Sequence, residues 1–150
     1  MQEALDEAGE ELKRVDHLIF VSLKYTRTVD MIRHGIERCI TCFDFLIEAL
    51  LRYAKSRKKI DEIPSNPGTR AELIRKMYSK DSKIIEFISF YSDLRKLMLP
   101  EYTKTREYRR HVAMLAKVDG KPVEINIDTV TQYYENAKEY FAYIREVVSK

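Results

Sequence analysis

Arg106 and His111, separated by four residues, are the two side chains of this sequence best suited to chemistry. An imidazole gains and loses a proton between about pH 5 and 8, and a guanidinium can hold a phosphate through two parallel hydrogen bonds. Metal-independent cleavage of RNA needs these functions, proton transfer and a cation that stabilises the phosphorane. The alternative interpretation is structural, with Arg106 paired to Glu101 or Glu107 and His111 lying at the surface.

The residues around this pair are of types that bind nucleic acid. Cations would add affinity for phosphates and aromatic rings would stack on bases. A charge cluster of this kind is also typical of a solvated protein face. The candidates for RNA or phosphate binding are Lys104, Arg109, Arg110, Tyr102 and Tyr108.

A second group of candidates, Arg27, Asp30, Arg33 and His34, occurs at helical spacing earlier in the chain. Asp30 can pair with Arg27 or Arg33 on one helix face, and a charge ladder of this kind is typical of a solvated face. The group gains functional interest if the helix is buried there, because buried charges need partners.

Composition indicates one mainly helical domain over residues 1–150. The 150 residues are 45% hydrophobic and 34% charged, with a net charge of +3 and four residues each of Gly and Pro. One core fits this length, and so few turn residues argue against a β-sandwich. No apolar run approaches the roughly 18 residues of a membrane span, and no signal peptide is recognisable, so we expect a cytoplasmic protein.

Apolar periodicity predicts helices over 4–25, 29–54, 67–98 and 129–148, with a kink at 79–82 and a stop at Pro100. Alternation around an Asp119-Gly120 turn predicts a two-stranded hairpin over 112–127. Thr28 and Asp128 are the expected N-caps. The fold class is therefore mainly α, an up-and-down bundle of four to five helices with a small β-hairpin before the last helix.

Cys39 and Cys42 form a C-x-x-C pair on the apolar face of the second helix. A thioredoxin-like motif would follow a strand, and a zinc site would need a second ligand cluster. The pair is therefore interpreted as buried core cysteines, and a redox role is the alternative. We predict neither a metal nor a cofactor, because the sequence has no Gly-rich phosphate loop and no cluster of metal ligands.

Four tyrosines on the last predicted helix suggest an interface, since tyrosine favours surfaces that are wet at one end and apolar at the other. One small core is not expected to hold all four. A homodimer through this helix or the hairpin follows as a prediction, and half-buried rings around one bundle are the alternative. The tyrosines are Tyr133, Tyr134, Tyr140 and Tyr143.

The order of the helices, together with the Arg-x-x-x-x-His motif at 106–111, resembles the HEPN superfamily (higher eukaryotes and prokaryotes nucleotide-binding domain). That resemblance implies a small, commonly dimeric helical bundle with two motifs facing each other across one cleft. It implies an RNA-associated module, in its catalytic form a toxin-like, metal-independent endoribonuclease that uses Arg106 and His111. Many members are inactive, so the alternative is a non-catalytic interaction or scaffold protein, such as the helical partner subunit of a nucleotidyltransferase.

Overall fold

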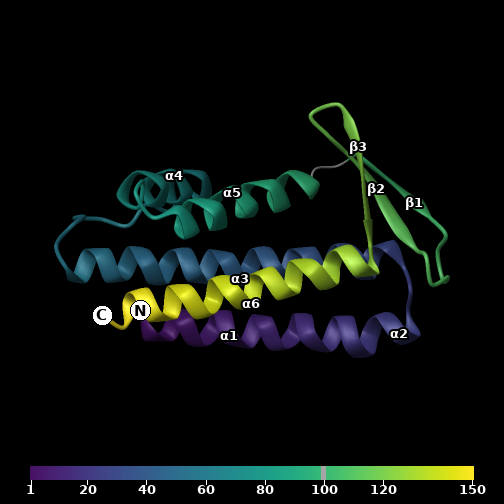
Figure 1. The fold of residues 1–150 in the computed structure, drawn as a ribbon, viewed down its shortest axis with the longest axis horizontal. Helices are drawn as coiled ribbons and strands as arrows, with labels where there is room; N and C mark the ends of the chain where they lie inside the picture. Colours follow the sequence, from purple (N-terminus) through teal and green to yellow (C-terminus); the bar gives the residue numbers. More distant parts are fainter. Residues whose placement is uncertain (99–100) are drawn as a thin grey trace.

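The chain is mainly helical in the computed structural model, with one small antiparallel sheet at one end (Figure 1). The structure describes residues 1–98 and 101–150, so the helix stop predicted at Pro100 lies outside the described residues. Within this part of the chain, no helix combines the length and the apolar character that a membrane span requires.

Three long helical segments lie side by side and form the body of the molecule (Figure 1). The first is interrupted, against prediction, by a π turn. Thr28 caps the second by accepting a hydrogen bond from the Met31 N–H, which confirms the predicted cap. The segments are α1 (Gln2–His17) with η1 (Leu18–Ser22) and α2 (Leu23–Tyr25), α3 (Val29–Ser56), and α6 (Ile127–Val148).

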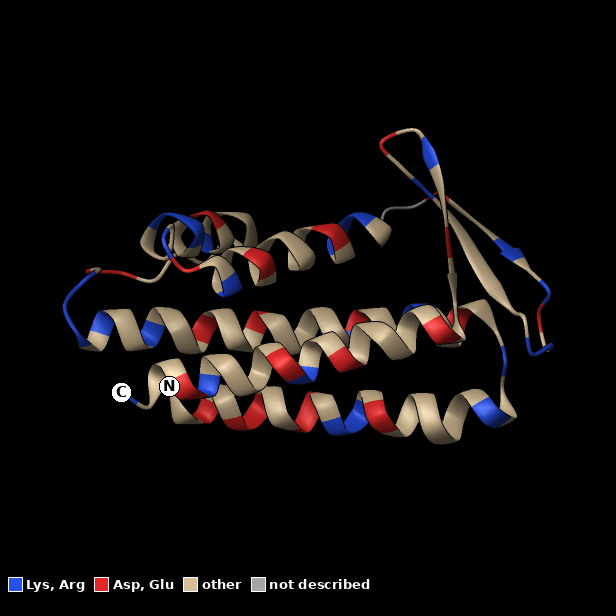
Figure 2. Cartoon of the chain, viewed as in Figure 1, with Lys and Arg blue, Asp and Glu red and all other residues tan. Residues whose placement is uncertain are grey.

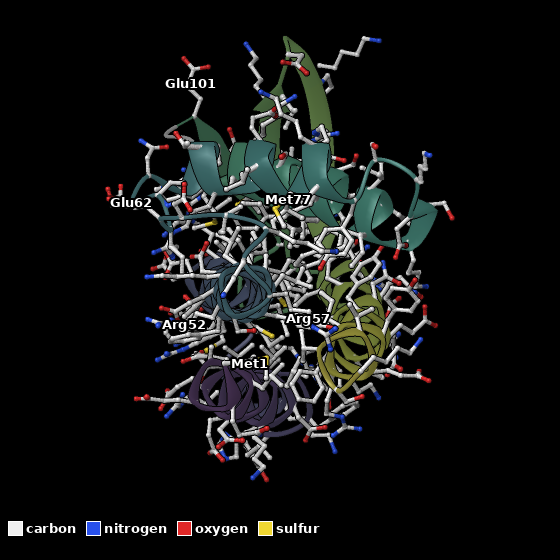
Figure 3. The ribbon with its side chains drawn as sticks, turned by 90° about the vertical axis from the view of Figure 1, so that its left-hand side faces the viewer. Met1, Arg52, Arg57, Glu62, Met77 and Glu101 are labelled. Carbon is white, nitrogen blue, oxygen red and sulfur yellow. The ribbon has the colours of Figure 1, made fainter. Side chains whose placement is uncertain are left out.

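The third predicted helix, over 67–98, is divided into α4 (Pro67–Met77) and α5 (Ser82–Leu97), which cover one side of α3 (Figures 1 and 3). The break falls where a kink was predicted, because the Asp81 carboxylate accepts hydrogen bonds from the Lys83 and Ile84 N–H groups and starts a new helix. The mainly α class is confirmed. The regular up-and-down bundle is found only in part.

The sheet has three strands, β1 (Tyr102–Thr105), β2 (Ala113–Val118) and β3 (Lys121–Asn126), in the order β1-β2-β3. The predicted hairpin is β2 and β3, and the positive φ angles of Asp119 (52°) and Gly120 (79°) confirm its primed turn. The two-stranded prediction was wrong because β1 pairs with the other edge of β2, with Tyr102 opposite Ala116. This third strand makes the sheet less dependent on the helices for its stability.

Helix α6 begins earlier than predicted. Asn126, not Asp128, is its N-cap, and its side chain accepts a hydrogen bond from the Thr129 N–H while the Thr129 hydroxyl bonds back to the Asn126 N–H. This reciprocal capping box fixes where β3 ends and α6 starts. Asp128 lies in the first turn, where its charge interacts favourably with the helix dipole.

An aromatic cluster joins α3, α5 and α6 in the core. The Phe43 ring lies 5.0 Å from that of Phe87 and 6.0 Å from that of Tyr140. Cys39 and Cys42 are fully buried, as predicted, and burial raises the pKa of the Cys39 thiol to about 12. Both thiols therefore stay protonated at neutral pH and behave as small core residues.

The tyrosines of α6 are all accommodated by one chain, against the argument from which a dimer was predicted. Tyr134 and Tyr140 are buried, and Tyr133 packs on Phe90 at 5.4 Å between ring centroids. The Tyr143 hydroxyl donates to Asp81 at 2.8 Å. Because α6 lies between α1, α3 and α5, several of its faces meet protein. The homodimer stays a prediction without this support.

Candidate functional site

An open groove of about 820 Å³ lies where the end of the first helical segment, the loop after β1 and the start of α6 meet. These elements converge at the sheet end of the molecule, where Figure 2 shows Lys and Arg on the turn after β1 and on α2. The polar lining residues are Lys24, Arg27, Arg106, Arg110, His111, Glu124, Asn126, Asp128 and Thr131, and the apolar ones are Ile19, Phe20, Leu23 and Ile127.

Arg106 contacts the backbone of one groove residue and the carboxylate of another. Its Nε donates to the backbone carbonyl of His111 at 2.7 Å, and an Nη lies 2.5 Å from Oε1 of Glu124. The sequence offered Glu101 or Glu107 as the partner carboxylate; the structure provides Glu124 instead. Both members of the pair are about half exposed, so their mutual attraction contributes little to stability. The guanidinium keeps further N–H groups with which it can bind a ligand.

His111 and Glu124 line the same groove, His111 from the loop before β2 and Glu124 from β3. His111 is exposed and precedes β2, and Glu124 lies on the solvent face of β3, opposite Leu115. Sequence analysis missed Glu124 as a site residue. The available signal was its alternation with the buried Ile125, which places the Glu124 side chain on the outer face of the strand.

The loop that carries Arg106 and His111 is attached to the N-terminus of α3. Oε2 of Glu107 accepts a hydrogen bond from the Val29 N–H at 3.0 Å, so it occupies a donor that the helix itself leaves unpaired. The Tyr108 N–H donates to the carbonyl of Arg27 at 2.6 Å. The loop therefore has a defined position beside the α2–α3 junction.

Two residues of this loop have left-handed backbone angles, Arg106 with φ 52° and Tyr108 with φ 63°. Such angles are costly for residues with a Cβ, by about 1 kcal/mol each, and strain of this kind is concentrated at functional sites. The contacts of Glu107 and Arg106 offset this cost.

Asp30 pairs with neither Arg27 nor Arg33, in contrast to the predicted ladder. Its Oδ1 lies 3.2 Å from the Nζ of Lys104 on β1, and this hydrogen bond raises the pKa of Lys104 above its ordinary value. Lys104 thus links β1 to α3 through this ion pair and does not line the groove. The ladder prediction was wrong because a tertiary partner is closer than the helical neighbours.

Tyr102 and His34 are also placed outside the groove. The Arg33 guanidinium lies over the Tyr102 ring at 4.0 Å and covers it, so this ring is not available to a base. His34 lines a separate cleft between α1 and α3, where its Nε2 accepts from Arg38 at 3.4 Å. Of the earlier candidate group, Arg27 alone is found among the groove residues.

Glu107→Ala is expected to lower the free energy of unfolding by about 1 kcal/mol, because the Val29 N–H loses its capping partner. Thr28→Ala is the matched control, since it removes the neighbouring cap at Met31 and has a similar expected cost. Urea unfolding gives both values. Hydrogen exchange should accelerate at the amides of 106–111 in the Glu107 variant alone; equal acceleration in both variants would contradict the attachment of the loop by Glu107.

No family model matches this chain, and no curated protein or solved structure is detectably similar to it. The Arg106/His111 pair lies in a loop between two strands and not at the start of a helix, which differs from the arrangement that the HEPN resemblance implies. The function of the groove is therefore inferred from its own side chains.

Proposed function

We propose that the groove binds the ribose–phosphate backbone of RNA, as an RNA-associated module of HEPN-like type. The observation that carries the proposal is the convergence of cations from two separate segments on one groove: Lys24 and Arg27 from the end of α2 and the residues that follow it, and Arg106 and Arg110 from the loop after β1. These four charges exceed the two lining carboxylates, Glu124 and Asp128. A groove with this excess attracts polyanions.

The same groove holds the groups that metal-independent cleavage requires. In the proposed reaction, Glu124 takes the proton from the ribose 2′-OH, and the 2′-oxygen forms a bond to phosphorus. The bond from phosphorus to the 5′-oxygen breaks, and His111 donates a proton to that oxygen. Arg106, which contacts both residues, stabilises the charge on the phosphorane. The products are a 2′,3′-cyclic phosphate and a 5′-hydroxyl.

Glu124 also removes the need for a second chain in this chemistry. The HEPN resemblance implies that two motifs from a dimer share one cleft, so that each chain provides one histidine. In the proposed site, one chain supplies two proton-transfer groups and the cation. A homodimer is compatible with the proposal but is not required by it.

RNA affinity is expected to fall steeply with salt, because each phosphate contact to a single strand contributes a slope of about −0.7 in log K against log salt. Arg110→Gln and Arg27→Gln should each reduce the magnitude of this slope by about 0.7, as measured by fluorescence anisotropy over a range of salt concentrations. The matched control is Lys59→Gln, because Lys59 is exposed beyond the opposite end of α3.

The Lys59 variant should keep the wild-type slope. A slope that changes as much in this control as in the groove variants would mean diffuse attraction to a basic protein and would contradict a defined phosphate groove. Undetectable RNA binding by the wild type would favour an interaction module, such as a nucleotidyltransferase partner.

A further inference from the structure

We infer that Tyr25 and Tyr108 form an aromatic rim beside the groove and make it selective for single-stranded RNA. This inference rests on the proposed function and specifies its substrate class. The cations of the groove bind the phosphates, and the two rings stack on bases that are unpaired and unstacked. A duplex presents the same phosphates but keeps its bases inside.

The two rings are unusually accessible. Tyr25 is 85% exposed and Tyr108 is 76% exposed, whereas the next most exposed large apolar residue among the described residues, Phe20, is at 46%. A single exposed apolar side chain needs no explanation in a soluble protein. Two aromatic rings beside a basic groove do call for one, because aromatic side chains gain much free energy from burial and find it elsewhere in this fold.

The backbone places both tyrosines close to Arg27. The Tyr108 N–H donates to the Arg27 carbonyl at 2.6 Å, and Tyr25 lies two residues before Arg27 at the end of α2. Arg27 itself lines the groove. Both aromatic positions therefore lie next to a residue whose cation we assign to phosphate binding.

The conformation of Tyr108 also points to a role outside the fold. Its φ of 63° is strained for a residue with a bulky side chain, yet its ring gains little burial in return. Tyr102 provides the contrast within the same segment: it has an extended backbone in β1 and its ring is covered by Arg33. Strain that exposes a ring is explained if the ring has a ligand.

The chemistry of the rim selects among ligands. Exposed rings next to cations match a chain that alternates anionic groups with flat π-faces, which is the composition of single-stranded nucleic acid. Phe20, which lines the groove itself, is assigned to the fold rather than to the rim, because its ring packs edge-on against Tyr134 at 6.3 Å between centroids and is less exposed than the two tyrosines. The rim is thus confined to two side chains and can be tested with two substitutions.

The test measures anisotropy of a fluorescein-labelled RNA of about 12 nucleotides, long enough for one site, as a single strand and annealed to its complement. The variants are Tyr25→Leu and Tyr108→Leu, which keep an apolar side chain without a π-face, and Tyr25→Phe and Tyr108→Phe, which keep the ring. Each leucine variant should bind the single strand about tenfold more weakly, within the range measured for base–aromatic stacking. Its affinity for the duplex and its salt slope should be unchanged, and the phenylalanine variants should match the wild type.

Four results would overturn the inference. Equal losses for single strand and duplex, or equal losses for leucine and phenylalanine, would refute stacking while RNA binding by the groove stands. Conversion of a wild-type dimer to a monomer by the leucine variants, seen by light scattering, would show that a second copy covers the rings. A wild type that binds neither RNA form would refute the proposed function together with the rim.

Discussion

Phe43→Ala is expected to lower the free energy of unfolding by about 3–5 kcal/mol, the largest stability effect that we predict. Phe43 is fully buried, and its ring packs against Phe87, Phe90 and Tyr140, so one side chain joins α3 to both α5 and α6. Alanine would leave a cavity between three helices that cannot close without moving them. Small domains have about 5–15 kcal/mol in total, so this variant should be close to unfolding at 37 °C.

Urea and thermal unfolding followed by circular dichroism measure this loss. Phe20→Ala is the matched control, because it removes the same ring from a half-exposed position on the π turn. Its expected cost is below about 1 kcal/mol. Similar losses for the two variants would contradict the position of Phe43 at the centre of the core.

The helices could be predicted from the sequence because each buries one face, and burial imposes a period on the apolar residues. Helix α3 is the clearest case: its buried positions, such as Ile32, Ile36 and Phe43, recur at steps of three, four or seven. Local chemistry also sufficed at Thr28 and at the Asp119-Gly120 turn, where the residue types match the backbone that they must adopt.

Strand β1 could not be predicted, because it lacks a buried alternating face. Its four residues are half-buried only at Tyr102 and Thr105, and its hydrogen bonds depend on β2, which follows after an irregular loop. The start of α6 was misplaced for a similar reason. Asn126 and Asp128 are both good caps by type, and the choice between them depends on where β3 ends.

Part of the candidate site could be predicted from the sequence. The side chains of Arg106 and His111 share one groove, and Arg110 and Arg27 join them. The partners of these residues could not be found, because long-range pairings are set by how the sheet packs on the helix ends. Thus Lys104 is bound to Asp30, and the Tyr102 ring is covered by Arg33. Glu124, which is most important for the proposed chemistry, comes from a strand eighteen positions after Arg106.

His111→Ala is expected to reduce the rate of RNA cleavage by about 10²–10⁴-fold, because the 5′-oxygen would leave without a proton donor. The assay follows a pool of single-stranded RNA in EDTA and identifies 2′,3′-cyclic phosphate ends. His34→Ala is the matched control: it removes an exposed imidazole from the separate cleft between α1 and α3. This control should cleave at the wild-type rate.

Glu124→Gln separates catalysis from binding at the same groove. It removes the proposed base and one of the two lining carboxylates, so cleavage should fall by a similar factor while RNA affinity rises, since the phosphates meet less negative charge. If Glu124 merely held Arg106 in place, the Glu124→Gln variant would bind RNA more weakly, and its cleavage would fall in proportion to the lost binding. Wild-type protein that binds RNA but leaves it intact would retain the groove as a binding site and refute its catalytic role. Equal cleavage by wild type and His111→Ala would instead trace the activity to a contaminant or to other residues, because the proposed reaction cannot proceed at the wild-type rate without this imidazole.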